Sequence, residues 1–436
     1  MILRKVFVLM ILFLLVTFST AEGRKNVIYM IGDGMGIAQM TLAHHAKGSP
    51  LTMEAFPNTG IAFTPSLDSF VTDSAAAGTA LATGNKTKNG MISMVPGRRS
   101  CITIMEAAQN AGWKAGIVTT TRVTHATPAC FGAHQDNRGS EEKIAVQMVE
   151  SRVNVLFGGG RAYFLPEKEK GRRKDGENLF IRAREVGYTI IGNRSEMAKA
   201  SGNMIMGLFT DEHMSYELDR DPTVEPSLAA MTAKAIEVLS DPKNTFFLMV
   251  EGGKIDHAAH NHDAASVVAE TLAFDRAVQV ALEFAGRRSD TIVVVTADHE
   301  TGGLSLSNGD YCIKPQVLSG VTRSFEELNR LVNKDRSNIV EVVKEYTGIN
   351  DLSNQEIDAL KAEVTPPKGF MSATYYVLAQ LINQRAMLAW PTTSHSGCPV
   401  AVLGFGPGTE CFNGFMDNTD LPKRIAGIAG IDYFNW

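Results

Sequence analysis

Carboxylate and imidazole side chains lie directly beyond several short apolar runs of this 436-residue sequence. The clearest example is the run Phe246–Val250, which is followed by Glu251, a glycine pair, Asp256 and His260. A short apolar run is typical of a buried strand, and residues four apart share one face of a helix. The alternative interpretation is an ordinary polar helix start with solvated side chains.

Two further apolar runs end in the same way, which favours a shared metal site over three unrelated surfaces. Residues 26–31 precede Asp33, and residues 291–297 precede Asp298 and His299; a late histidine, His395, precedes another apolar run. Carboxylates and imidazoles without a Cys-x-x-Cys motif suit zinc, manganese, cobalt or magnesium. These side chains outnumber the ligands that one ion can use, so we expect at least two metal ions.

A serine in an alanine-rich stretch is the candidate nucleophile. Ser74 precedes a helical run, and a serine in this position is commonly just the N-cap of the helix. The functional alternative is a hydroxyl activated by a neighbouring metal, with the amides at the helix start facing an anion.

The elements that must position these side chains alternate along the chain. Short β-branched runs alternate with helical stretches up to about Gly302, which predicts an α/β fold: a doubly wound, largely parallel central sheet with helices on both faces. The expected strands are 26–31, 115–119, 153–157, 188–191, 246–250 and 291–296, with 399–404 following later.

The pattern changes between about residues 304 and 391, which we interpret as an inserted helical or irregular cap-like region. Residues 324–346 and 354–364 are charged and helix-prone, and residues 373–390 are more apolar. Because the insertion returns beside His395, we expect it to lie near the site or to form a subunit contact.

Composition narrows the class of protein. Hydrophobic residues make up 44% of the chain, and the net charge of -5 provides no basic field for nucleic acid.

Residues 1–21 resemble a signal peptide, which predicts export to the periplasm or the extracellular space and a mature domain over 22–436. An uncleaved anchor is the alternative, but the apolar stretch of 13 residues is shorter than the roughly 20 that span a bilayer. Five cysteines leave at least one unpaired, and their spacing does not determine the connectivity.

Taken together, these segments resemble the alkaline phosphatase family over nearly the whole mature chain. The segment Asp73–Thr79 is similar to the nucleophile signature of that family, and Thr127-Pro128-Ala129 is similar to its magnesium-site turn. The segments 251–260, 298–300 and 395–397 resemble its metal-ligand segments.

The resemblance implies three metal sites and a phosphate-binding arginine. The first site would use Asp256, His260 and His395, the second Asp33, Asp298, His299 and the oxygen of Ser74, and the third Asp33, Thr127 and Glu251. By the same resemblance we expect two Zn²⁺ ions (Co²⁺ is possible), one Mg²⁺ ion, a grip of Arg138 on two phosphate oxygens, and a homodimer.

Two histidines depart from the enterobacterial pattern of aspartate and lysine. These are His125 and His257, and we expect both to support the site from behind the metal ligands. Imidazole favours softer ions than aspartate does, so the third site is expected to bind magnesium weakly or to accept zinc or cobalt. Because His257 stands where the enterobacterial pattern has a lysine, a fixed positive charge is missing there, which predicts weaker phosphate binding. His44, His45, His134, His213 and His262 are interpreted as surface or packing residues.

The sequence therefore predicts an exported metal-dependent phosphomonoesterase that acts on small phosphate monoesters through a phosphoserine. A phosphodiesterase, nucleotide pyrophosphatase or sulfatase of the same superfamily is the alternative within enzymes. An exported phosphate- or metal-binding protein without turnover is the alternative outside them.

Overall fold

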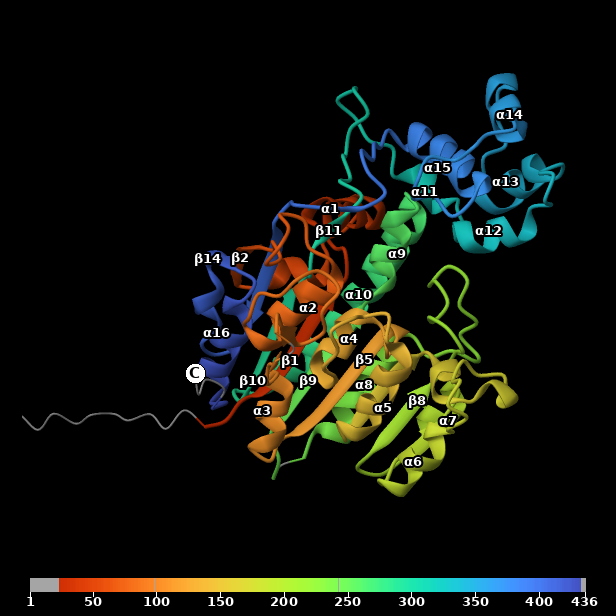
Figure 1. Cartoon of the computed structure of the whole chain (residues 1–436). Coiled ribbons are helices and arrows are strands. Elements are labelled where there is room, and N and C mark those ends of the chain that lie inside the picture. Colours follow the sequence, from red (N-terminus) through yellow and green to blue (C-terminus); the bar gives the residue numbers. More distant parts are fainter. Residues whose placement is uncertain (1–22, 98, 242, 433–436) are drawn as a thin grey trace, which may run out of the picture.

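The computed structural model describes residues 23–97, 99–241 and 243–432, and the expected signal peptide lies outside these ranges. A ten-stranded sheet forms the centre of the molecule, with the strand order β14-β2-β13-β10-β1-β9-β5-β6-β8-β7 (Figure 1). Its strands are β1 Asn26–Gly32, β2 Asn58–Phe63, β5 Lys114–Arg122, β6 Val155–Gly159, β7 Thr189–Ile191, β8 Ile205–Leu208, β9 Phe246–Gly252, β10 Thr291–Thr296, β13 Val400–Phe405 and β14 Gly414–Asp417. Two short antiparallel pairs lie outside this sheet: β3 Met94–Val95 with β4 Arg99–Ser100, and β11 Glu300–Thr301 with β12 His395–Ser396.

The largely parallel sheet that the sequence predicts is confirmed. Strand β13 pairs antiparallel with both β10 and β2, and all other pairings in this sheet are parallel. Every expected strand is present, with ends shifted by up to three residues. Strands β2, β8 and β14 were not predicted, because each is short and contains a glycine that interrupts its apolar pattern.

Helices cover both faces of the sheet. They are α1 Ile37–Lys47, α2 Ser74–Thr83, α3 Ile104–Asn110, α4 Ala126–Gly132, α5 Glu141–Glu150, α6 Leu179–Glu185, α7 Arg194–Lys199, α8 Leu228–Leu239, α9 Lys254–His260, α10 Ala264–Ala285 and α16 Asp420–Ala429. Consecutive residues of β5 identify the two faces, since side chains alternate along a strand. A Cβ on Gly116 would meet Leu239 of α8, whereas Ile117 packs under Gly132 of α4.

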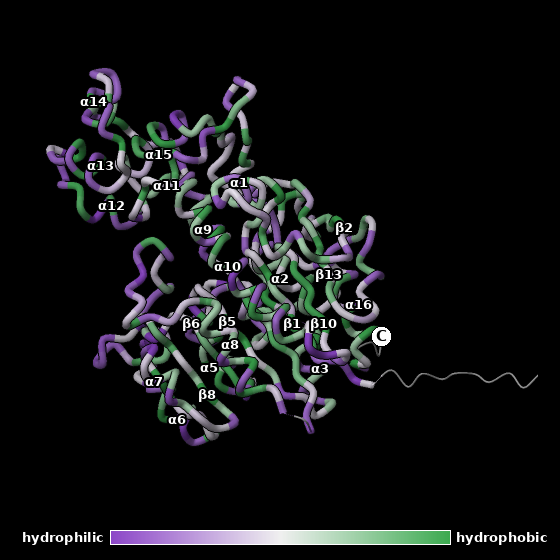
Figure 2. Tube along the Cα trace, turned by 180° about the vertical axis from the view of Figure 1, so that it is seen from behind, coloured by the Kyte–Doolittle hydropathy of each residue, from purple (hydrophilic) through white to green (hydrophobic). Residues whose placement is uncertain are grey.

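The insertion has a hydrophobic core of its own. It contains α11 Gln316–Ser319, α12 Phe325–Leu331, α13 Ile339–Thr347, α14 Asn354–Lys361 and α15 Ala373–Ala386. Their buried side chains form one cluster, which also takes in Leu42 of α1 and Val268 of α10. In Figure 2 the central strands β1 and β10 are green, and the outer turns of this region are largely purple. The boundaries 304 and 391 stay a prediction.

The helix-prone stretch 324–346 is two helices rather than one. Residues 332–338 are rich in Asn, Asp and Ser, whose side chains compete with helical hydrogen bonds. Asn338 donates to the carbonyl of Leu331 at the end of α12, and Arg336 has φ +56°. This turn reverses the chain between α12 and α13.

Two smaller findings bear on the sequence predictions. Among the residues that the structure describes, no helix has both the length and the apolar character needed to cross a bilayer. The five cysteines, all of which are described, are free thiols.

Candidate active site

Adjacent strands bring the predicted side chains to one edge of the sheet. In the parallel register, Ile31 of β1 stands level with Glu251 of β9 on one side and with Thr296 of β10 on the other. Asp33, at the end of β1, therefore lies between the two other ligand segments. Gly34 allows the close approach that follows, because a Cβ there would lie 2.8 Å from the Cα of Asp256 and the residue has φ +71°.

The first group consists of Asp256, His260 and His395. Oδ1 of Asp256 lies 3.3 Å from Nε2 of His260 and 3.6 Å from Nε2 of His395, and the two Nε2 atoms are 3.2 Å apart. Ligands on a tetrahedral zinc ion with bonds of 2.0–2.1 Å are separated by about 3.3 Å, so the spacing fits such an ion.

The backbone fixes the tautomer of both imidazoles. Nδ1 of His260 lies 2.6 Å from the carbonyl oxygen of Thr393, and Nδ1 of His395 lies 2.8 Å from that of Thr72. A carbonyl only accepts, so each Nδ1 carries a proton, and Nε2, which is turned towards Asp256, is the nitrogen that can bind a metal once it is unprotonated. This is the arrangement in which histidine binds a metal.

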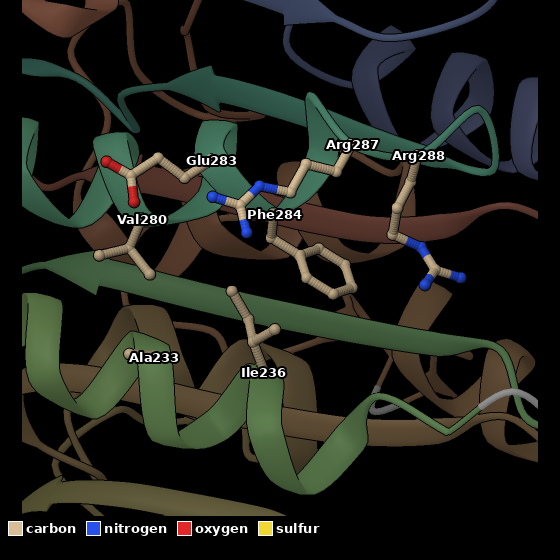
Figure 3. Close-up of a pocket in the computed structure, with 7 residues that line it drawn as sticks. All are labelled: Ala233, Ile236, Val280, Glu283, Phe284, Arg287 and Arg288. Atoms are coloured by element: carbon tan, nitrogen blue, oxygen red, sulfur yellow. The ribbon is translucent and has the colours of Figure 1, made fainter.

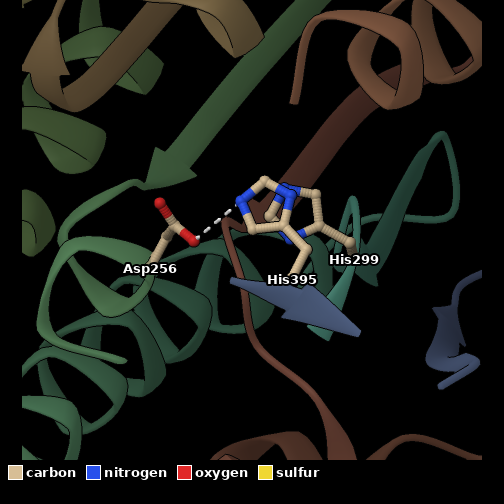
Figure 4. Close-up of side chains that lie close together, drawn as sticks. All are labelled: Asp256, His299 and His395. Atoms are coloured by element: carbon tan, nitrogen blue, oxygen red, sulfur yellow. Dashed lines mark ion pairs between the residues drawn. The ribbon is translucent and has the colours of Figure 1, made fainter. Parts of the chain in front are cut away.

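His299 links the first group to the second. Its ring stacks on that of His395 with a centroid separation of 3.5 Å, and Figure 4 shows the two rings beside Asp256. Nε2 of His299 lies 3.4 Å from Asp298 and 3.6 Å from Asp33. Asp33, Asp298 and His299 thus form the second group, which is completely buried.

The third group lies behind Asp33. Ligand atoms of Asp33, Glu251 and His125 lie within 4.8 Å of one another. One oxygen of Glu251 accepts hydrogen bonds from the hydroxyl groups of Thr119 and Thr121. The hydroxyl of Thr127 lies 3.5 Å from Asp298 and so faces the second group as well. His125, expected behind the ligands, stands close enough to join them.

Buried carboxylate oxygens in these groups lack partners among the described residues. Both oxygens of Asp33 and Oε1 of Glu251 are buried without a hydrogen bond. Burial and the neighbouring Asp298 raise the pKa of Asp33 well above its ordinary value. Burial likewise raises the pKa of Asp298 to about 8 and that of Glu251 to about 7. A divalent cation would supply the missing partners and favour the charged forms, so the donor set fits metal ions.

Asp256 behaves differently from these acids. Burial alone would raise its pKa, but His260 and His395 hold it well below the ordinary value. Burial lowers the pKa of His260, and Asp256 outweighs this effect and raises it to about 9. The first group therefore balances its own charge, whereas the other two carry unbalanced acids.

Ser74 opens helix α2 but does not cap it. The N-cap is Asp73, whose Oδ1 accepts the backbone N–H of Ala76 at 2.9 Å. The hydroxyl of Ser74 is left free for the site and lies 3.3 Å from Nε2 of His299. The interpretation of Ser74 as the N-cap of this helix is wrong, because Asp73 is the N-cap.

Two side chains hold the guanidinium of Arg138 beside helix α2 and the third group. Its guanidinium donates to Oδ2 of Asp73 and to Nε2 of His125, each at 3.1 Å. Its backbone N–H donates to the carbonyl of Gly90 at 2.7 Å. The side chain remains 30% exposed, so it can meet a ligand from solvent.

His213 is a residue that sequence reasoning missed. Its ring centroid lies 4.4 Å from that of His257 and 5.4 Å from that of His125, and the latter two are 5.5 Å apart. Nε2 of His213 lies 2.5 Å from the guanidinium of Arg122. Burial lowers the pKa of all three histidines, so the cluster is neutral. No local signal in the sequence predicts this cluster, because His125 and His257 come from distant segments of the chain.

The other histidines left unassigned lie at surface or packing positions. His262 stacks on Trp390 at 5.1 Å, and His134 contacts the carboxylate of Glu106 at 2.8 Å. His44 contacts Glu54 at 2.7 Å, and His45 is exposed beside it.

A cavity elsewhere carries none of these groups. It lies between α8 and α10, has a volume of about 460 Å³ and is lined by Ile236, Val280, Phe284, Arg287 and Arg288 among others (Figure 3). No residue of the three metal-ligand groups lines it.

Comparison with known proteins identifies the fold and the family. A family model described as alkaline phosphatase matches residues 24–431. The chain belongs to the alkaline phosphatase family. The repressible alkaline phosphatase of Saccharomyces cerevisiae is 36% identical over 452 residues, covering 92% of this chain and 79% of the yeast protein.

Solved alkaline phosphatases have the same architecture. The enzyme of Thermus thermophilus superposes with a TM-score of 0.85 at 30% identity, over 94% of this chain and 92% of that one. A mutant TAB5 alkaline phosphatase, described as having Mg bound in its M3 site, gives a TM-score of 0.71 at 30% identity, over 94% and 99%. The resemblance expected from the motifs is confirmed, and as an alkaline phosphatase relative the chain is a phosphatase.

Proposed function

We propose that this phosphatase is an exported, metal-dependent phosphomonoesterase that transfers the phosphoryl group to Ser74 before releasing it to water. The observation that carries the proposal is the position of the Ser74 hydroxyl, which does not cap the helix and lies 3.3 Å from Nε2 of His299. Carboxylate oxygens of the same site are buried without hydrogen-bond partners among the described residues. A nucleophile next to a prepared cation site is the arrangement that phosphoryl transfer requires.

The three groups would hold the metal ions expected from the sequence. Asp256, His260 and His395 would hold one zinc ion, and Asp33, Asp298 and His299 the other. Asp33, Glu251 and Thr127, with His125 nearby, would hold magnesium or a softer ion. When bound, such ions neutralise phosphate charge and lower the pKa of hydroxyl groups and water.

The residues of the chain then have separate tasks. Oγ of Ser74 loses its proton and forms a bond to phosphorus, while the bond from phosphorus to the alcohol oxygen breaks and the alcohol leaves protonated. The oxygen of a water molecule then forms a bond to the same phosphorus while the bond from phosphorus to Oγ of Ser74 breaks, a proton from the water returns to Oγ, and inorganic phosphate leaves. Arg138 donates to two phosphate oxygens throughout, and Asp73 keeps its guanidinium in place.

Helix α2 adds to the binding of the phosphate. Ser74 is its first residue, and the amides at the start of a helix carry partial positive charge. The helix has ten residues and is buried along its whole length, so these amides have a fixed direction. A negatively charged group at Ser74 would be stabilised from this side as well.

Export and assembly are part of the same proposal. The basic and apolar character of residues 4–18 supports secretion to the periplasm or outside the cell. The homodimer is supported by the family resemblance. Size-exclusion chromatography with light scattering, and the N-terminal sequence of protein recovered from the secreted fraction, test these two points.

The main experiment compares p-nitrophenyl phosphate with bis-p-nitrophenyl phosphate. We expect the monoester to be the far better substrate, activity to disappear after chelation, and zinc with magnesium to restore it. Ser74→Ala should lower kcat by at least about 10³-fold, and acid quenching with labelled phosphate should trap phosphate on Ser74 in the parent protein. Thr83→Ala, at the other end of α2, is the control. Full activity in Ser74→Ala would refute the mechanism, and a better rate on the diester would favour the phosphodiesterase.

A further inference from the structure

A second cavity adjoins the first candidate metal group. It has a volume of about 460 Å³ and lies between helix α9, the segment after β8 and the insertion. Its wall includes Lys254, His257 and His260 of α9, and Met371 and Tyr375 of the insertion. Figure 1 shows α9 between the body of the protein and the insertion. The side chain of His260 is 35% exposed, so this ligand faces the open space.

Helix α9 borders both the metal group and the cavity, and His260 contributes to both. Asp256 and His260, four apart, point towards the metal group, and Lys254 and His257, three apart, line the cavity. With a rise of 1.5 Å per residue, Lys254 lies about 9 Å along the axis from His260. A substituent on the oxygen that leaves phosphorus would extend into the space between them.

Lys254 is a buried cation without a hydrogen-bond acceptor. The residue is 4% exposed, and its ammonium group lies 3.6 Å from the ring centre of Tyr216 and 4.0 Å from the carboxylate of Glu326. Within the described part of the chain it donates no hydrogen bond, since 4.0 Å exceeds hydrogen-bond distance. Because Lys254 lines the cavity, a ligand oxygen there can accept a hydrogen bond from its ammonium group.

The charges around the cavity argue against an anionic ligand. Glu326 and Glu212 line it, and Glu270, Asp219 and Glu225 lie near enough to act on Lys254. Glu212 is itself paired with Arg172 at 2.5 Å, and among the described residues that line the cavity Lys254 is the one lysine or arginine. Carboxylates therefore outnumber the free cations, and a second negative charge would be repelled.

Hydroxyl groups suit this wall better than any charged group. A hydroxyl can accept from Lys254 and donate to Glu326, and the buried ring of Tyr375 and the exposed Met371 offer apolar surface to C–H groups. We infer that this cavity receives the alcohol part of the substrate and favours a neutral polyhydroxylated alcohol, as in a sugar phosphate. The inference rests on the proposed phosphomonoesterase function and names its substrate class.

The test uses two primary alkyl phosphates that differ in what they place in the cavity. Glucose 6-phosphate extends into it and ethyl phosphate does not, and their leaving groups are chemically similar. We expect Lys254→Met to lower the ratio of kcat/KM for glucose 6-phosphate to that for ethyl phosphate by about tenfold, mainly through KM. A ratio does not depend on the amount of active enzyme, so partial misfolding does not affect it. Lys344→Met, on an exposed lysine of α13, is the matched control and should leave the ratio unchanged.

A second variant tests the charge argument. The side chain of Glu326 is 68% exposed, so Glu326→Gln should fold normally. It should raise the rate on 3-phosphoglycerate, whose alcohol carries a carboxylate, relative to that on glucose 6-phosphate by about threefold. Glu341→Gln in α13 is its control.

The outcomes separate the two proposals. If the parent protein hydrolyses none of these esters, the proposed function fails. If it hydrolyses them but Lys254→Met and Glu326→Gln leave the ratios unchanged, or if it prefers 3-phosphoglycerate to glucose 6-phosphate, the substrate inference is overturned and the phosphatase stands.

Discussion

Arg138 donates a hydrogen bond to Nε2 of His125 at 3.1 Å, while its other guanidinium nitrogen is held by Asp73. The arginine thus connects the cap of the Ser74 helix with the third group. Because Nε2 of His125 accepts this hydrogen bond, the ring proton lies on Nδ1, which is buried without a partner. His125 can offer Nε2 to a cation only when Arg138 turns away from it, as it would towards a bound phosphate.

Replacing this arginine should weaken both substrate and product binding. We expect Arg138→Ala to lower kcat/KM for p-nitrophenyl phosphate by about 100-fold, because two charged donors to the phosphate are lost. The inhibition constant of inorganic phosphate should rise with it. Arg161→Ala, which removes a surface arginine paired with Asp211, is the control. An unchanged phosphate inhibition constant would show that Arg138 does not contact the anion.

The imidazole at 125 should limit magnesium binding. A carboxylate prefers hard ions, so His125→Asp should lower the Mg²⁺ concentration for half-maximal activation by about tenfold. The measurement is a magnesium titration of activity with zinc held constant. His125→Asn offers an oxygen without the charge and should give a smaller shift. If neither variant changes the magnesium dependence, His125 has no part in the third site.

Position 257 should set the affinity for the product. Burial, with His213 and Lys254 nearby, holds the pKa of His257 well below its ordinary value, so the ring is uncharged at neutral pH. A lysine there would bring a cation close to the phosphate, and we expect His257→Lys to lower the inhibition constant of phosphate severalfold. The neutral variant His257→Gln should leave it near the parent value. Equal inhibition in all three proteins would contradict the prediction.

A histidine away from the metal groups should make stability depend on pH. Burial lowers the pKa of His134, but Glu106 at 2.8 Å outweighs this, and the net pKa lies above 6.5. The charged form is therefore favoured on folding, so its contribution is full below about pH 6.5 and is lost as pH rises through the higher folded-state pKa. His134→Gln should lower the urea midpoint clearly at pH 6 and little at pH 9. The exposed His45→Gln should show no such difference, and a loss that is equal at both pH values would exclude the ion pair as its source.

The sequence predicted those strands whose own residues form a clear apolar pattern. Strands β1, β9 and β10 are largely apolar runs with an acid at or just beyond their ends, so their type and the convergence of their ligand segments followed from one observation. Strands β8 and β14 have four residues each, and only their neighbours in the sheet make them strands. Such tertiary effects leave no local signal.

In the candidate site, too, some features could be predicted from local sequence and others depend on the folded chain. Segments rich in ligands could be recognised, but the identity of the helix cap could not, because Asp73 and Ser74 are both good N-cap residues. His213 was missed since its partners, His125 and His257, come from distant segments and meet only in the folded chain. The individual roles of the site residues stay predictions until the variants are measured.

The pairing of β11 with β12 has a consequence for how the protein is made. This short pair sets His395 beside Thr301, after the whole insertion has been completed. With the roles proposed above, a growing chain contains Asp33 and Ser74 early in synthesis but lacks one ligand of the first site until His395 has been added. A chain that stops before His395 would therefore be expected not to hydrolyse phosphate esters, even though it already contains Asp33 and Ser74.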